Sequence, residues 1–213
     1  MLINNIYDKG LIVSKNEEFG LESFIKGTNI IKEICNPNSL ILVIDDKSIQ
    51  STLALVSSIR ARINLILIDI TNFERQYKEI INKFNPDLIL SSGKVFSKLG
   101  FDNLIRTDFF NIFSINKSKE KSLQYCQNLP LVLLATSGTS GPQKFVGLTH
   151  NNLKVNCNSI KKYLLTNKKT KCINNLPCSY SYGLSVLNTT LNSGGHTLYP
   201  RNHQFLENVF GKI

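Results

Sequence analysis

Leu40-Ile41-Leu42-Val43-Ile44 is a run of consecutive apolar residues, and the stretch that it begins decides the fold. A continuous apolar run of this length is typical of a strand that is buried on both faces of a sheet. Residues 48–60 and 73–84 then carry apolar side chains at helical spacing, and the shorter apolar runs at 65–68 and 88–90 are typical of further strands. This alternation predicts a β-α-β-α-β unit with a parallel sheet and helices on both faces.

The same alternation continues on both sides of this unit. Residues 21–34 have helical spacing, and the apolar run at 129–135 predicts another buried strand. Residues 91–128 show no comparable pattern, although the polar stretch 114–121 predicts an exposed connector. The later predicted elements are a helix at 151–165, a strand at 172–176, a helix at 183–191, a strand at 197–199 and the start of a helix at 205–210. We therefore predict an α/β protein with doubly wound, mostly parallel sheets flanked by helices, divided into a first half at 1–128 and a second, truncated unit at 129–213.

The composition excludes several classes of protein. The chain has 213 residues, of which 42% are hydrophobic and 19% charged, so it can bury a core and is neither disordered nor collagen-like. No apolar run approaches the ~20 residues of a membrane helix, and we expect neither a membrane span nor a secretory signal. The five cysteines show no CxxC spacing, which favours reduced thiols and a cytoplasmic location.

The net charge of +10 raises the alternative of nucleic-acid binding. Only five of the 25 basic residues are arginine, the side chain best suited to contacts with phosphates and bases. We therefore expect no nucleic-acid partner. His196 and His203 lie near Cys172 and Cys178 in the sequence, but their spacing is not that of a zinc site, so we also expect no metal bound by protein ligands.

A stretch rich in glycine and hydroxyl groups follows the apolar run at 129–135. It reads ATSGTSGPQK from Ala135 to Lys144. Glycines allow backbone N–H groups to converge on an anion, the hydroxyl groups add donors, and Lys144 adds a positive charge. The spacing differs from the GxxxxGK[ST] pattern of a P-loop, so composition alone leaves two alternatives, a polyphosphate site and an ordinary surface loop.

The order of the motifs favours the polyphosphate site. Residues 136–153 resemble the signature loop of the adenylate-forming superfamily, whose pattern is close to TSGTTGxPKGVxLTHxNL and whose members include acyl-CoA synthetases, luciferases and the adenylation domains of peptide synthetases. Residues 175–184, NLPCSYSYGL, are similar to the LPxxHxxG segment of that family, and residues 191–200, LNSGGHTLYP, are similar to its LxxGGxxVxxP segment. The resemblance covers nearly the whole chain, and its specific motifs all follow Leu129.

This resemblance implies that a carboxylic acid is activated by ATP to an acyl-adenylate, with Mg²⁺ nearby, and is then transferred to the thiol of CoA or of a phosphopantetheine group on a carrier protein. It implies that Lys144 is catalytic and that Tyr180 and Gly183 contact the acid. It also implies a phosphate-binding set composed of Thr136, Ser137, Gly138, Thr139, Ser140, Gly141 and Lys144.

The sequence departs from the family pattern at two places. Pro-Lys-Gly is replaced by Gln143-Lys144-Phe145, which we expect to stiffen the exit of the loop. Tyr180 stands where the family has histidine, and it could gate the acyl pocket or pack in the core. For His150 we favour a structural role at the start of a helix, and for Asp45-Asp46 a role as N-cap of the helix that follows.

The segments in which the family binds adenine and ribose, and its C-terminal domain with a catalytic lysine, have no counterpart among these residues. We therefore expect an N-terminal part of a ligase that is inactive alone. The alternative is a non-catalytic module that binds a partner chain or an acyl-carrier protein. Because the family covers this side of the sheet with later strands, we expect Leu184, Leu187 and Leu191 to be partly exposed and to drive self-association.

Overall fold

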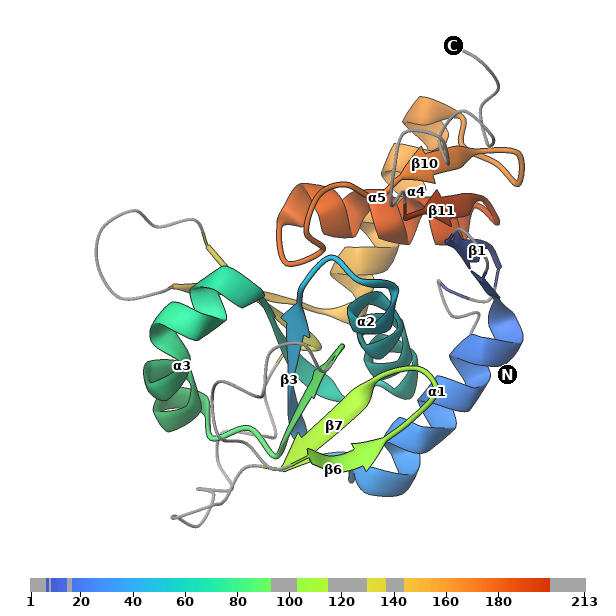
Figure 1. Cartoon of the computed structure of the whole chain (residues 1–213). Helices are drawn as coiled ribbons and strands as arrows, with labels where there is room; N and C mark the ends of the chain where they lie inside the picture. Colours follow the sequence, from blue (N-terminus) through green and yellow to red (C-terminus); the bar gives the residue numbers. More distant parts are fainter. Residues whose placement is uncertain are drawn as a thin grey trace.

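The computed structural model describes residues 7, 9–14, 17–92, 103–114, 130–136 and 144–199. Figure 1 shows a large twisted sheet covered by helices on both sides, with a smaller sheet at one end. The helices are α1 (Leu21–Ile34), α2 (Ile49–Ala61), α3 (Ile70–Phe84), α4 (His150–Leu164) and α5 (Ser181–Asn192). Within these described residues, no helix is both long enough and apolar enough to cross a bilayer.

The large sheet has seven strands in the order β6-β7-β5-β3-β4-β8-β9. Its parallel centre consists of β5 (Leu88–Ser91), β3 (Leu40–Asp45), β4 (Asn64–Asp69) and β8 (Val132–Ala135). Antiparallel strands flank this centre, namely β7 (Asn111–Ser114) and β6 (Asn103–Arg106) on one side and β9 (Phe145–Leu148) on the other. The predicted α/β class and the β-α-β-α-β unit are confirmed.

The apolar run at residues 40–44 is continuous because both faces of β3 are covered. Ile41 and Val43 point toward the core formed with α1, α2, α4 and α5, whereas Leu40, Leu42 and Ile44 point toward the core formed with α3. In Figure 1, α3 lies on one side of β3 and α2 on the other. The carboxyl ends of β3, β4 and β8 therefore share one edge of the sheet, and this edge carries the site described below.

The small sheet joins distant parts of the chain in the order β10-β11-β1-β2. Strand β1 (Leu11–Val13) lies parallel to β11 (His196–Leu198), which also pairs with β10 (Lys171–Ile173), and β2 (Glu18–Phe19) closes the other edge. The N-terminal residues are therefore held by the strand that follows α5, so both ends of the described chain meet in one sheet.

Several predictions from the sequence need correction or lie outside the described residues. The β6–β7 hairpin lies in the stretch where no element was predicted, and Ser114, assigned to a connector, is the last residue of β7. The strand predicted at 172–176 ends at Ile173, whereas the helix predicted at 205–210 lies outside the described residues. Strand β8 extends the large sheet past residue 128 by pairing with β4. The division into two units at residue 128 stays a prediction.

The prediction of an exposed apolar patch on α5 is wrong. Leu184, Leu187 and Leu191 are all buried, with at most 2% of the surface of each side chain exposed. They belong to the same core as α2 and the large sheet, and α4 packs directly on α5. The covering that we expected from later strands is therefore supplied by elements within the chain itself.

Candidate functional site

The glycine-rich stretch connects two paired strands at the carboxyl edge of the large sheet. Ala135, the last residue of β8, pairs with Phe145, the first residue of β9. Beyond this pair, the backbone N–H of Thr136 donates to the carbonyl oxygen of Lys144 at 2.9 Å, and the Thr136 hydroxyl approaches the same oxygen at 3.3 Å. Thr136 and Lys144 thus extend the pairing of β8 with β9 by one step, at the edge where parallel α/β sheets bind ligands.

Only the two ends of the expected phosphate-binding set fall within the described residues. Thr136 is half-buried and Lys144 is exposed to solvent. The expected ligands Ser137, Gly138, Thr139, Ser140 and Gly141 lie outside the described residues. Their role stays a prediction.

Phe145 stands where the family pattern has a glycine after its lysine, and its side chain contacts the end of α3. Its ring packs edge-on against Phe84 at the end of α3, with 4.8 Å between the ring centroids and 77° between the planes. The Lys83 ammonium lies over the Phe145 ring, 5.7 Å from its centroid. The exit of the loop is therefore anchored to α3 by an aromatic contact.

The segment that resembles LPxxHxxG forms a tight turn that leads into α5. The N–H of Tyr180 donates to the carbonyl oxygen of Pro177 at 3.1 Å, and Tyr180 is the N-cap residue of the helix. About 45% of the Tyr180 side chain is exposed. Of the two interpretations from the sequence, core packing does not describe this side chain, because so much of its ring is open to solvent.

Gly183 lies in the first turn of α5 and is needed for packing. A Cβ atom at this position would lie 2.1 Å from the carbonyl oxygen of Pro177, which is a backbone atom and cannot move aside cheaply. The glycine therefore allows the helix to pass directly over the turn. Contact of Gly183 with a substrate stays a prediction.

Asp45 links this turn to the central strand of the large sheet. Its carboxylate accepts hydrogen bonds from the N–H of Ser179 at 2.8 Å and from the N–H of Lys47 at 3.0 Å, and only 3% of the residue is exposed. Burial raises the pKa of this carboxyl group, although the two N–H donors oppose the shift. The residue before Tyr180 is thus fixed to the carboxyl end of β3.

The N-cap interpretation of Asp45-Asp46 is wrong, because Ser48 is the N-cap of α2. The Ser48 hydroxyl accepts from the N–H of Ser51 at 3.0 Å. Asp46 instead accepts from the N–H of Ser48 at 3.1 Å and from the hydroxyl of Ser92 after β5. Its carboxylate therefore joins the loops that follow two neighbouring strands.

Buried polar side chains connect the turn to the small sheet. Asn174 donates to the Cys178 sulfur at 3.4 Å and to the hydroxyl of Tyr199, which also bonds to Thr52 on α2. Burial raises the pKa of the Cys178 thiol to about 12 and that of Cys157 to about 11, so neither is a reactive thiolate near neutral pH. These buried side chains are therefore uncharged near neutral pH and have a structural role.

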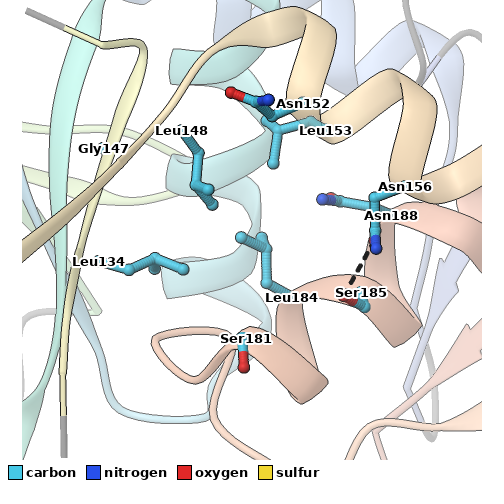
Figure 2. Close-up of a pocket in the computed structure, with 10 residues that line it drawn as sticks. All are labelled: Leu134, Gly147, Leu148, Asn152, Leu153, Asn156, Ser181, Leu184, Ser185 and Asn188. Carbon is cyan, nitrogen blue, oxygen red and sulfur yellow. Dashed lines mark hydrogen bonds between the residues drawn. The ribbon is translucent and has the colours of Figure 1, made fainter.

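A cavity of about 360 Å³ lies between the β8–β9 hairpin and the helices α4 and α5 (Figure 2). Its lining includes Leu134 of β8, two residues before Thr136, and Ser181 of α5, directly after Tyr180. It thus adjoins both segments that carry the family motifs. The remaining lining residues are Gly147, Leu148, Asn152, Leu153, Asn156, Leu184, Ser185 and Asn188.

The sequence analysis missed the polar residues of this cavity. Ser181, Ser185 and Asn188 follow one another at four and three positions, as residues on one helix face do, and Asn152 and Asn156 are four apart on α4. This spacing in the sequence indicates that the polar residues of each helix share one face. Its significance depended on the packing of α4 against α5, which the pattern of either helix alone does not show.

The remaining candidates from the sequence are the histidines. His150 is the first residue of α4, after the N-cap Thr149, and burial together with the nearby charges of Arg62 and Lys154 lowers its pKa. Within the described ranges, no group of three His, Cys, Asp or Glu side chains could hold a metal ion. His203 lies outside those ranges.

The comparisons with known proteins agree with this arrangement. Residues 32–211 match the family described as AMP-binding enzyme. The chain is 24% identical over 183 residues to peramine synthetase ppzA of Metarhizium rileyi (strain RCEF 4871), an alignment that spans 83% of this chain and 6% of that protein. The protein of the same name from Metarhizium majus (strain ARSEF 297) is 23% identical over the same shares.

Solved structures share the fold at low sequence identity. ATP-bound MatB from Rhodopseudomonas palustris has a TM-score of 0.70 at 16% identity, over 96% of this chain and 45% of that one. The nonribosomal peptide synthetase FmoA3 has a TM-score of 0.65 at 12% identity, over 92% of this chain and 21% of that one. This chain therefore spans less than half the length of each of these structures and a small fraction of the curated relatives.

Proposed function

The chain belongs to the AMP-binding enzyme family, and from this premise we propose that it is the N-terminal part of a ligase that activates a carboxylic acid with ATP. The products would be an acyl-adenylate and pyrophosphate, and the acyl group would then pass to the thiol of CoA or of a carrier protein. The observation that carries the proposal is the β8–β9 hairpin, closed by Thr136 and Lys144 at the carboxyl edge of the sheet, within the matched range.

The chemistry requires that negative charge be neutralised while the reacting groups are held in line. A carboxylate oxygen of the acid attacks the α-phosphorus of ATP, the bond from that phosphorus to the β-phosphate oxygen breaks, and pyrophosphate leaves with the electron pair. Backbone N–H groups and hydroxyls between Thr136 and Lys144 would bind the β- and γ-phosphates, and the Lys144 ammonium would balance the charge that develops on the leaving group.

Mg²⁺ would enter with the phosphates of ATP, because the described part of the chain offers no cluster of metal-ligating side chains. When bound, it would share the neutralisation of phosphate charge with Lys144. The thiol would react in the second step, in which its sulfur attacks the acyl carbon and AMP leaves.

Tyr180 would separate the acid from the phosphate loop. Its exposed side chain belongs to the N-cap residue of α5, directly before Ser181, which lines the cavity of Figure 2, and the hydrogen bond between Asp45 and Ser179 fixes the backbone just before it. An aromatic ring in this position limits the shape of the acid that can reach the loop. We extend the proposal to a cytoplasmic location, in keeping with the buried thiols of Cys157 and Cys178.

A second candidate function is a module that binds a partner chain or an acyl-carrier protein without catalysis. Large apolar side chains near the end of α4 and the start of α5 favour it, since Tyr163, Leu165 and Tyr182 are 84%, 78% and 68% exposed. Two results together would establish this second function instead. The chain would bind a carrier protein, and a longer polypeptide that contains it would not exchange pyrophosphate into ATP.

The test of the first function is acid-dependent exchange of labelled pyrophosphate into ATP by a longer polypeptide that contains this chain. Lys144→Ala should slow the exchange by roughly 100- to 1,000-fold, because one preorganised electrostatic contact to developing charge is lost. Unfolding by urea should be nearly unchanged, since the side chain is exposed. Lys162→Ala, on the exposed surface of α4, is the matched control. Equal exchange rates for Lys144→Ala and the parent would contradict the phosphate-binding role.

A further inference from the structure

Within the described residues, the amide side chains that line the cavity of Figure 2 have partners at their oxygens and not at their amino groups, so they present hydrogen-bond donors. The Oδ1 atom of Asn188 accepts from the hydroxyl of Tyr7 at 2.5 Å. The Oδ1 atom of Asn156 accepts from the hydroxyl of Ser185 at 3.1 Å. In both side chains the Nδ2 amino group is left with no acceptor among the residues that the structure describes.

Asn152 repeats this arrangement at the start of α4. Its Oδ1 atom accepts from the N–H of Thr149 at 2.9 Å and from the Thr149 hydroxyl at 2.7 Å, in the capping box of the helix. Its Nδ2 group likewise has no acceptor in the described part of the chain. Three amide groups from two helices therefore offer N–H donors, and the side chain of Asn188 is almost wholly buried, at 1% exposed.

The rest of the lining is apolar or hydroxyl-bearing and uncharged. Leu134 and Leu148 of the hairpin, Leu153 of α4 and Leu184 of α5 point toward one another in Figure 2, and no described lining residue carries a charge. A carbon chain can contact the leucines while an oxygen atom meets the amide donors. An ammonium group would find no carboxylate here, and an additional carboxylate would find no cation.

We propose that this cavity receives the tail of the carboxylic acid and selects a short acid whose tail carries an uncharged oxygen acceptor, such as a keto or amide oxygen. The identification of the ligand as a carboxylic acid rests on the proposed function. The selection itself rests on the donors: an alkyl tail would leave the Nδ2 group of the buried Asn188 unpaired and would displace water from the exposed amides of Asn152 and Asn156, whereas a carbonyl oxygen would accept from these donors.

Three acids of equal chain length separate these possibilities: pentanoate, 4-oxopentanoate and 5-aminopentanoate. The chain itself, labelled with nitrogen-15, is titrated with each acid while the side-chain amide resonances of asparagine are followed by NMR. We expect 4-oxopentanoate to bind roughly five- to tenfold more tightly than the other two and to shift the amide resonances of Asn156 and Asn188. Equal affinity for the three acids, absence of binding, or binding that leaves these amides unshifted would overturn the proposal.

Asn156→Leu removes one donor at an accessible position of α4, and Asn158→Leu, two residues further on the same helix and outside the cavity lining, is its control. The first variant should bring the affinity for 4-oxopentanoate down to that for pentanoate, and the second should preserve the difference. Identical behaviour of the two variants would overturn the assignment of the donor.

Exchange of pyrophosphate by a longer polypeptide then separates this inference from the proposed function. Exchange that is supported best by pentanoate would overturn the inference and leave the function standing. Selective binding of 4-oxopentanoate to the chain, with no acid-dependent exchange by the polypeptide, would overturn the function and leave the selectivity of the cavity standing.

Discussion

Asp45 shows how a single residue couples the sheet to the proposed substrate segment. The sequence placed it at the end of a strand, where a carboxylate commonly caps the next helix. Its real partner is the N–H of Ser179, 134 residues further along the chain. No local pattern contains that contact, because it arises only when the turn before α5 meets the carboxyl end of β3.

The titration of Asp45 should be visible in the stability of the protein. Burial raises its pKa above the usual 3.8, so the folded state holds the proton more tightly than the unfolded state does. Its contribution to stability is therefore fully present below pH 3.8 and is lost as the pH rises through the higher pKa of the folded state. Asp45→Asn does not titrate.

The parent should therefore gain stability relative to Asp45→Asn as the pH falls from neutral toward that of the unfolded carboxyl group. Urea unfolding of both proteins across this range measures the difference. A difference that is independent of pH, or that grows as the pH rises, would show that folding does not raise the pKa of the Asp45 carboxyl group.

Tyr180 carries the second prediction at this scale. If its ring gates the acyl pocket, Tyr180→Ala should alter the order in which acids support pyrophosphate exchange and admit bulkier ones, because an aromatic side chain that limits depth has been removed. Tyr182→Ala removes another exposed ring of α5, two residues away, and should leave that order unchanged. An unaltered acid preference in Tyr180→Ala would exclude the gate.

At the scale of elements, sequence periodicity predicted the strands that helices cover on both faces and the helices that pack in the same cores as those strands. Strands β3 and β4 and helix α2 follow from their apolar residues because their burial is nearly complete, whereas helix α1 follows from the spacing of one buried face that includes Phe24 and Ile31. The β6–β7 hairpin was missed because its strands have four residues each and are defined by antiparallel pairing, of β6 with β7 and of β7 with β5. Strand β1 was missed because it is stabilised by β11, at the other end of the chain.

The junction between the turn and α5 depends on Gly183. Gly183→Ala would place a methyl group against the carbonyl oxygen of Pro177, and we expect the free energy of unfolding to fall by about 1–3 kcal/mol. Thermal or urea unfolding measures this change in the chain alone, without any substrate. Unchanged stability would contradict the packing role of Gly183.

For the whole molecule, the central feature is that one sheet edge brings together the base of the glycine-rich loop, the Asp45 carboxylate and the turn at Tyr180. The motifs allowed the loop and the turn to be predicted from the sequence. The cavity between them was not predicted, because its amide donors come from two helices whose mutual packing is a tertiary property. We propose that a carboxylate meets the α-phosphorus of ATP at this edge.

Transfer of oxygen from the acid to AMP tests that claim most directly. A longer polypeptide that contains this chain is supplied with ATP, a thiol acceptor and a carboxylic acid labelled with oxygen-18 in its carboxyl group. If the carboxylate attacks the α-phosphorus, the AMP released by the thiol retains one labelled oxygen on its phosphate, which mass spectrometry detects. AMP that is formed in step with acyl transfer but carries no label would contradict the account.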